Sequence, residues 1–182
     1  MVKTKQINPQ SFKKLWKNKK ATENIEPILL DIVKEYRVKV HKPQWSVTRK
    51  DLADRIFSEY IRLKYADKNW NCKCVTCWAV VPRTEIQNWH FVSRGNMKYR
   101  FSDENCFPQD YRCNCLLNWN YQAYTLFMID KFGRKRVEEM LNDRTIKEYK
   151  QYEYEEMIIK RYQFITERKE KIKKTKKVLQ FD

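Results

Sequence analysis

Apolar residues at helical spacing predict two helices in the first third of the chain. The first covers Ile25 to about Val40 and ends before Pro43, so His41 is expected to be an exposed loop residue rather than a ligand. The second begins at Thr48, which with Asp51 has the spacing of a capping box. Its apolar face, which we expect to pack against the centre of the chain, consists of Leu52, Ile56, Tyr60 and Leu63.

The same periodicity predicts two more helices in the last third. A short amphipathic helix runs through Tyr124 and Phe132, and Gly133 can end it in a left-handed conformation. Thr145 and Glu148 have the spacing of a second capping box, which predicts that a long helix opens there. Its apolar side is read as a core stripe rather than as a platform for bases, and it consists of Tyr154, Ile158, Tyr162 and Ile165.

The segment between these helices favours strands. Residues from Cys72 up to Pro82 are rich in Val, Thr and Trp, and Ile86 to Val92 is expected to return as the second strand of a hairpin. Residues 93 to 110 are polar and contain Gly95 and Pro108. We expect them to form a connection, and a connection of this length in a compact domain is usually functional.

Composition narrows the classes of function. The 182 residues carry a net charge of +16, and a positive field concentrates polyanions, so nucleic acid is the leading partner. A surface that serves solubility, or that binds an anionic membrane, is the alternative. The two glycines leave no Gly-rich loop for a nucleoside triphosphate. No run approaches the roughly 18 apolar residues of a membrane span and no apolar signal core opens the chain, so a soluble, intracellular protein is expected.

All six cysteines fall in the central stretch, which in an intracellular chain indicates metal binding more than disulfides. Cys74 and Cys77 form a Cys-x-x-Cys pair suited to tetrahedral zinc. A second pair would complete a structural site, but Asp110 stands three residues before Cys113. Because a carboxylate can also ligate zinc, these four residues are a feasible set. Buried thiols without metal are the alternative, and the spare thiols that could substitute are Cys72, Cys106 and Cys115.

His90 is the candidate catalytic residue of this stretch. A neutral imidazole can take a proton from a water that attacks phosphorus, and a divalent cation held partly by Asn114 would offset the developing charge. Asn105 would hold the strand that orients His90. A histidine satisfied in the core is the alternative. Three basic residues in the loop after His90 are placed to bind phosphates, or else only face solvent: Arg94, Lys98 and Arg100.

Taken together, these motifs resemble the phage recombination nuclease family called NinG or Rap, which is related to the HNH (ββα-metal) endonucleases. The resemblance extends from about Asp51 to Leu141 and rests on the order and spacing of its pieces. The matching segments are Phe57 to Asp67, Cys74 to Cys77, His90 to Arg94, Arg100-Phe101, Glu104-Asn105, Pro108-Gln109, Cys113-Asn114, Asn120, Tyr124, Phe132-Gly133 and Val137-Glu138.

The resemblance implies an α+β fold with a small, zinc-stabilised ββα-metal core, similar to a treble clef and flanked by helices. The expected division is a basic arm and helix over 1–47, the nuclease core over 48–142, and a long basic helix over 143–182. The implied activity is hydrolysis of branched DNA recombination intermediates in the host cytoplasm, with structural Zn²⁺ and catalytic Mg²⁺ or Mn²⁺. Paired incisions at a junction would favour a homodimer.

Three residues depart from the family pattern. Asp110 replaces a usual cysteine, and Trp89 and Trp119 stand where glycines are common. Tryptophan does not adopt the positive φ angles of glycine cheaply, so the local backbone is expected to differ unless those glycines serve close packing. The same substitutions motivate a second hypothesis, a zinc-containing nucleic-acid-binding protein without catalysis.

Overall fold

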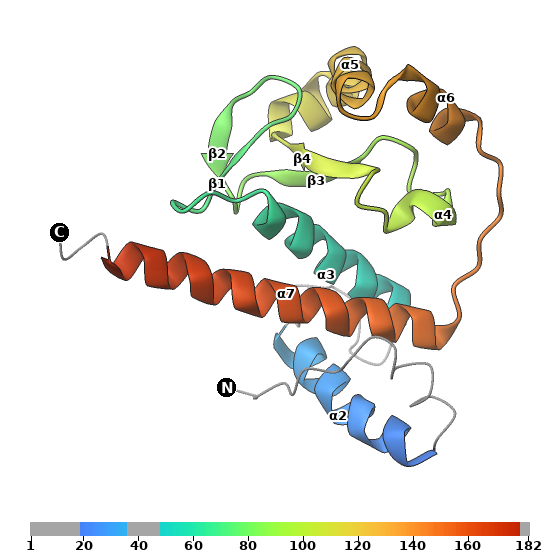
Figure 1. The fold of residues 1–182 in the computed structure, drawn as a ribbon, viewed down its shortest axis with the longest axis vertical. Helices are drawn as coiled ribbons and strands as arrows, with labels where there is room; N and C mark the ends of the chain where they lie inside the picture. Colours follow the sequence, from blue (N-terminus) through green and yellow to red (C-terminus); the bar gives the residue numbers. More distant parts are fainter. Residues whose placement is uncertain (1–18, 36–47, 179–182) are drawn as a thin grey trace. The chain divides into compact units, whose positions relative to one another are not determined.

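The computed structural model describes residues 19–35 and 48–178, so the basic arm predicted before residue 19, His41 and the end of the first predicted helix lie outside the described residues. The described part is an α+β structure with two small antiparallel sheets (Figure 1). Its helices are α2 (Lys19–Glu35), α3 (Arg49–Lys64), α4 (Met97–Arg100), α5 (Tyr121–Phe132), α6 (Arg134–Asn142) and α7 (Gln151–Val178), with short helical turns η2 (Arg112–Leu116) and η3 (Asn118–Asn120). Its strands are β1 (Asn71–Lys73), β2 (Val80–Pro82), β3 (Gln87–His90) and β4 (Cys106–Gln109).

Contacts divide the chain into two compact units. One comprises Met1–Phe57 and Tyr149–Thr166, and the other comprises Ser58–Glu148 and Glu167–Asp182. The predicted domain boundaries after residues 47 and 142 stay a prediction. Among the described residues, no helix combines the length and hydrophobicity that crossing a membrane requires.

The first unit has a helical core. The predicted capping box opens α3, because the Asp51 amide donates to Thr48 Oγ1 at 3.1 Å and the Thr48 amide donates to Asp51 Oδ2 at 3.0 Å. Arg49 donates to the buried Glu155 at 3.0 Å. The buried apolar residues of this unit are Leu29, Ile32, Leu52, Ala53, Ile56, Phe57, Ile158, Ile159 and Ile165.

The second unit is built on the two sheets. Strand β1 pairs with β2, so that Cys72 lies opposite Val81, and the turn between these strands carries Cys74 and Cys77. Strand β3 pairs with β4, so that His90 lies opposite Cys106. Helices α5 and α6 lie together on one side of the β3–β4 pair (Figure 1). The core between them consists of Val75, Phe91, Tyr99, Phe107, Tyr124, Met128, Val137 and Met140.

The predicted hairpin partner of β3 was wrong. Strand β3 pairs with residues 106–109, which the sequence placed in a polar connection, and not with the strand that ends at Pro82. Proline cannot donate to a ladder, so Pro108 argued against a strand. In the structure Pro108 is buried, and its carbonyl accepts from the Val75 amide at 3.1 Å, which ties this strand to the cysteine turn.

Helix α5 ends at Gly133, where the sequence predicted. Gly133 has φ 81 and ψ 151, a region open essentially to glycine, and its amide donates to Ile129 O at 2.8 Å. Of the two predicted side chains of α5, Tyr124 is fully buried and Phe132 is half-buried against the same core, which also contains Met128. The residue is therefore the predicted one, although its ψ places it outside the left-handed helical well.

The predicted start of the long helix was wrong. Helix α7 begins at Gln151, where the Lys150 amide donates to Glu153 Oε2 at 2.9 Å, and not at Thr145. The Thr145 amide instead donates to Asp143 Oδ1 at 2.8 Å, so this threonine belongs to a turn after α6. The Asp143 side chain therefore accepts from the Thr145 amide, which in a capping box would donate to the Glu148 side chain.

A buried carboxylate joins several cationic side chains in the second unit. Glu59 is only 8% exposed and pairs with Arg83 at 2.6 Å, Arg62 at 3.0 Å and Lys169 at 3.6 Å. Burial alone would disfavour its charge, but the attraction of Arg83, Arg62 and Lys169 outweighs burial and lowers the pKa of Glu59. This cluster links α3 to α7 and to Arg83, the residue that follows β2.

Candidate functional site

The four predicted metal ligands lie together. One ligand atom from each of Cys74, Cys77, Asp110 and Cys113 is within 4.8 Å of the others, and all but Cys77 are buried. A tetrahedral zinc with bonds of about 2.3 Å to sulfur holds its thiolates roughly 3.8 Å apart, so only a small contraction is needed. This cluster could hold a metal such as zinc.

Asp110 uses its two oxygens differently. Oδ1 accepts from the Cys113 amide at 2.7 Å, while Oδ2 lies 2.7 Å from Cys77 Sγ. Although the residue as a whole is exposed, partial desolvation of the Cys77 thiol raises its pKa to about 12, and its bond to Asp110 adds to that shift. Burial opposes ionisation of Asp110, but its bonds from Cys77 and the Cys113 amide lower its pKa overall. One oxygen is therefore fixed by the backbone and the other faces the thiols, as a single-oxygen ligand requires.

Polar groups around the cluster face its sulfur atoms. Cys74 Sγ lies 3.2 Å from Thr76 Oγ1, and Asn120 Nδ2 donates to Cys113 Sγ at 3.6 Å. Such outer contacts orient metal ligands and stabilise thiolate charge. Neither residue was predicted to have this role, because the spacing of ligands carries no information about their surroundings.

The three spare cysteines lie outside the cluster. Cys72 is buried and donates to Arg62 O at 3.1 Å, and burial raises the pKa of its thiol to about 11. Cys106 is buried opposite His90 on β4, and Cys115 is exposed near Gln87. Asp110, and not one of these thiols, is therefore the fourth member of the set.

His90 lies at the end of β3 and on the wall of a pocket of about 530 Å³. The side chain is 8% exposed, and its Nε2 is 2.9 Å from the carbonyl oxygen of Arg100. A carbonyl can only accept, so Nε2 carries a proton, and in a neutral ring the lone pair is then on Nδ1, which is buried. The pocket wall also includes Arg94, from the loop that follows.

Asn105 is completely buried, directly before β4. Its Oδ1 accepts from the Val92 amide at 2.6 Å, and its Nδ2 donates to the carbonyls of Val92 at 2.9 Å and Tyr99 at 3.1 Å. Its own carbonyl accepts from the Phe91 amide at 2.9 Å. Asn105 thus joins the end of β3 to α4, the element whose last residue accepts from His90.

Asn114 lies in η2, directly after the last metal-ligand candidate. It is buried, and its Nδ2 donates to Gln87 Oε1, three residues before His90 on β3. Its Oδ1 is buried and accepts no hydrogen bond from the described residues. A position three residues along a strand is roughly 10 Å away, so Asn114 is held near the opposite end of β3 from His90. Gln87 was not predicted to take part.

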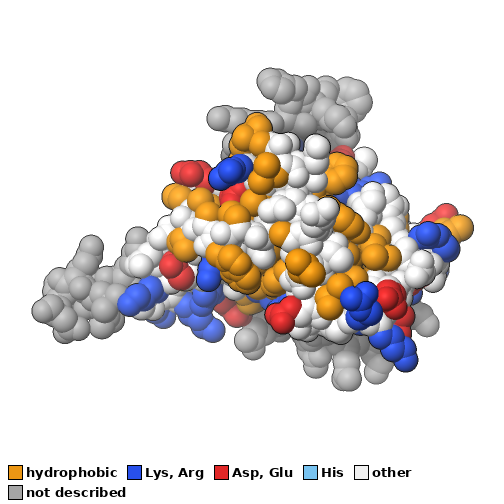
Figure 2. Space-filling model, turned by 90° about the horizontal axis from the view of Figure 1, so that it is seen from above, with side chains coloured by type: hydrophobic (Ala, Val, Ile, Leu, Met, Phe, Trp, Pro, Cys, Tyr) orange, Lys and Arg blue, Asp and Glu red, His pale blue; other side chains and the backbone are white. Residues whose placement is uncertain are grey.

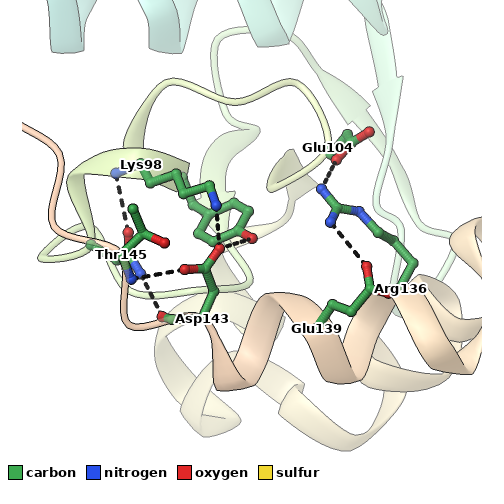
Figure 3. A network of polar contacts seen from close by, with 8 residues as sticks. Lys98, Glu104, Arg136, Glu139, Asp143 and Thr145 are labelled. Carbon is green, nitrogen blue, oxygen red and sulfur yellow. Dashed lines mark hydrogen bonds and ion pairs between the residues drawn. The ribbon is translucent and has the colours of Figure 1, made fainter.

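The predicted phosphate-binding residues have internal partners. The Arg100 guanidinium donates to Arg94 O at 2.7 Å. Lys98 pairs with Asp143 at 2.5 Å, and Figure 3 shows Lys98 and Thr145 both directed at that carboxylate. The Asp143 carboxylate raises the pKa of Lys98, and Lys98 in turn holds the pKa of Asp143 well below its usual range. Part of the charge of Lys98 is therefore already offset.

The two tryptophans that depart from the family pattern contact each other. Their rings stack with centroids 5.6 Å apart and an interplanar angle of 21°. Trp89 lies in an extended strand, where no positive φ is needed, and its carbonyl accepts from Tyr124 at 3.2 Å. Trp119 keeps the backbone of a glycine position, with φ 70 and ψ −1. The expected change of backbone is therefore absent at Trp119.

A family model described as Bacteriophage Lambda NinG protein matches residues 2–177 of the chain. No curated protein and no solved structure gave a match. The matched range extends well beyond the central motifs that first indicated the resemblance. Because it includes nearly all of the 182 residues, the chain belongs to the NinG family of bacteriophage proteins.

Proposed function

We propose that this chain is a metal-dependent, structure-specific DNA endonuclease that acts on branched recombination intermediates. The observation that supports it best is the contact of His90 Nε2 with the Arg100 carbonyl, which favours the tautomer with its lone pair on Nδ1. The Nε2–H of His90 donates to the Arg100 carbonyl at 2.9 Å on the wall of a pocket that also contains Arg94. Membership of a phage family and the net charge of +16 agree with DNA as the substrate.

In this proposal His90 is the general base. Nδ1, which is buried in this structure, takes a proton from a water molecule that the pocket must admit to it, the oxygen of that water attacks phosphorus, and the departing DNA oxygen leaves with the bond electrons. The contact with the Arg100 carbonyl keeps the ring oriented and stabilises the imidazolium that forms, because an Nε2–H donor to a carbonyl strengthens when the ring is charged. Asn105 acts as a positioning residue, since it joins the segment after His90 to α4.

We propose a structural role for zinc in the cluster of Cys74, Cys77, Asp110 and Cys113. These four donors match the closed set of a structural site, with no open position for substrate. Such a site would fix the cysteine turn relative to η2. The zinc-stabilised ββα-metal core implied by the resemblance is part of the same proposal, with β3, β4 and the helical turn after them as its elements.

A catalytic cation requires oxygen ligands, and Asn114 offers one. Its Oδ1 is buried and receives no hydrogen bond from the described residues. Amide oxygens of this kind are ligands that hard divalent cations accept. Mg²⁺ or Mn²⁺ bound there would lie toward the Gln87 end of β3, so the DNA backbone would have to run along this strand from His90 for the cation to offset charge on the scissile phosphate and the departing oxygen. The described residues hold no second cluster of three acidic, Cys or His ligands, so phosphate oxygens and water must complete the shell.

The test is incubation of the purified protein with a labelled four-way junction and the matching linear duplex, in Mg²⁺, Mn²⁺ or a chelator. We expect cutting of the junction that requires the cation. His90→Ala should bind the junction as the parent does but cut it at least 100-fold more slowly. The exposed Lys135→Ala is the control for general loss of charge. Equal cutting by parent and His90→Ala would refute the assignment of the base.

The second candidate is a zinc-containing nucleic-acid-binding protein without catalysis. The observation in its favour is the stack of Trp89 on Trp119 beside His90, at positions where the family pattern has glycines. It predicts salt-sensitive binding of branched DNA with no cutting in any divalent cation. The same incubation therefore separates the two candidates.

A further inference from the structure

Two stacked aromatic pairs flank His90. Trp89 stacks on Trp119 as described, and Phe91 stacks on Tyr121 with centroids 5.4 Å apart and an interplanar angle of 1°. Trp89 lies in β3 and Phe91 directly follows its last residue, and their partners Trp119 and Tyr121 are likewise two positions apart. The result is a pair of aromatic steps that line the same pocket as His90.

The outer members of these pairs are open to solvent. Trp119 is 51% exposed and Tyr121 is 41% exposed, whereas Phe91 is only 4% exposed. Trp89 and Phe91 therefore support Trp119 and Tyr121 from the protein side, and the rings of Trp119 and Tyr121 are exposed to solvent. Figure 2, which looks onto the side of the molecule that carries α5, shows hydrophobic side chains gathered on this face. An exposed aromatic surface with a fixed backing is what base stacking requires.

The turn that carries Trp119 is held in a costly backbone conformation. Asn118, Trp119 and Asn120 have consecutive φ angles of 46, 70 and 44. Gln109, which is fully buried, donates to the Trp119 carbonyl at 2.6 Å, and Asn120 donates to the metal-ligand candidate Cys113 at 3.6 Å. Strain of this kind persists only where the surroundings impose it, and it is concentrated at functional sites. The indole is therefore presented from a fixed position.

We propose that Trp119 and Tyr121 form a stacking platform for unpaired bases of the DNA strand whose backbone passes His90. This inference rests on the proposed function and specifies its substrate. An unpaired nucleotide combines a flat apolar base with an anionic phosphate, which matches aromatic rings beside Arg94 in a chain of charge +16. In a fully paired duplex both faces of each base are already stacked, so the platform selects DNA whose bases are unpaired at a branch.

The test measures binding without cutting, by anisotropy in a chelator at fixed salt, for a duplex with a three-base bulge and for the fully paired duplex. Trp119→Gly removes the ring but tolerates the positive φ. We expect it to weaken binding of the bulged DNA by roughly 5- to 150-fold and to leave the paired duplex unchanged. Trp119→Phe should retain most of the affinity. Trp78→Gly is the matched control, because Trp78 has φ 66 and is 57% exposed but lies outside the pocket.

A second readout detects the stack directly. A 2-aminopurine placed in the bulge should lose fluorescence on binding to the parent and to Trp119→Phe, but not to Trp119→Gly. The platform is overturned if the parent binds bulged and paired DNA equally, if Trp119→Gly keeps both affinity and quenching, or if Trp119→Gly changes only self-association in sedimentation. Absence of cutting with the expected binding and quenching would overturn the proposed catalysis and leave the platform in place.

Discussion

Asp110→Asn separates the two roles of Asp110. The amide keeps an oxygen that can accept from the Cys113 backbone, so the turn into η2 should be retained. It loses the anionic oxygen that faces Cys77 Sγ at 2.7 Å, which is the atom placed to bind metal. The substitution therefore removes a candidate ligand and one negative charge while it changes the size of the side chain very little.

The magnitude follows from the ligand set. Removing an outer-shell partner typically costs 10- to 100-fold in metal affinity, so the loss of one of four direct ligands should exceed about 100-fold, or roughly 2.7 kcal/mol. Asp110→Cys should bind zinc at least as tightly as the parent, because it restores a fourth thiolate. Its metal-free form should be less stable by about 1 kcal/mol, since a thiol is a poor acceptor for the Cys113 amide.

The assay is competition for zinc against a chromogenic chelator, with urea unfolding of each protein with and without zinc. One zinc per chain is expected. Asp130→Asn, at an exposed position on α5, is the control and should bind zinc as the parent does. If Asp110→Asn binds zinc as tightly as the parent, Asp110 is not a ligand and the reasoning from its geometry fails.

Three further predictions concern the scaffold. Glu59→Gln should lower the free energy of unfolding by roughly 2 kcal/mol at pH 7, and equal urea midpoints of parent and variant at pH 7 would contradict this. Because the pKa of Glu59 is lowered in the folded state, the difference in stability should be present above about pH 4.3 and shrink as pH falls. Gly133→Ala should cost about 1–3 kcal/mol through its φ of 81 alone, since nothing lies within 4 Å of the added Cβ, whereas Gly95→Ala should leave the melting temperature almost unchanged. Asp143→Asn should lower the hydrogen-exchange protection factors of the amides around Lys98 at pH 7. Because the pKa of Asp143 is depressed, its contacts persist as pH falls and are lost only in strong acid, where the protection factors of parent and variant should converge.

Features set by neighbouring residues could be predicted from the sequence. The Thr48 box and the end of α5 at Gly133 each depend on a few adjacent positions. The metal-ligand candidates are two local pairs, and the requirement for four ligands is enough to join them. The family could be predicted for the same reason, since its motifs keep their order and spacing.

Features set by tertiary contacts could not be predicted. Pro108 looked like a loop residue because its role in β4 uses only its carbonyl. Thr145 looked like a helix start because nothing in its spacing shows that Asp143 takes its amide. The stack of Trp89 on Trp119 joins residues 30 positions apart, and only the paired strands and η3 bring them together.

The most direct test of His90 as the general base is the single-turnover rate at which saturating protein cuts a bound four-way junction, for the parent and for His90→Ala with and without added imidazole. We expect His90→Ala to retain binding, to lose about 10²- to 10⁴-fold in rate, and to regain part of it when free imidazole replaces the missing side chain. A variant that cuts at the rate of the parent would show that His90 is not the base. Binding by a parent that never cuts would assign the chain to the non-catalytic alternative.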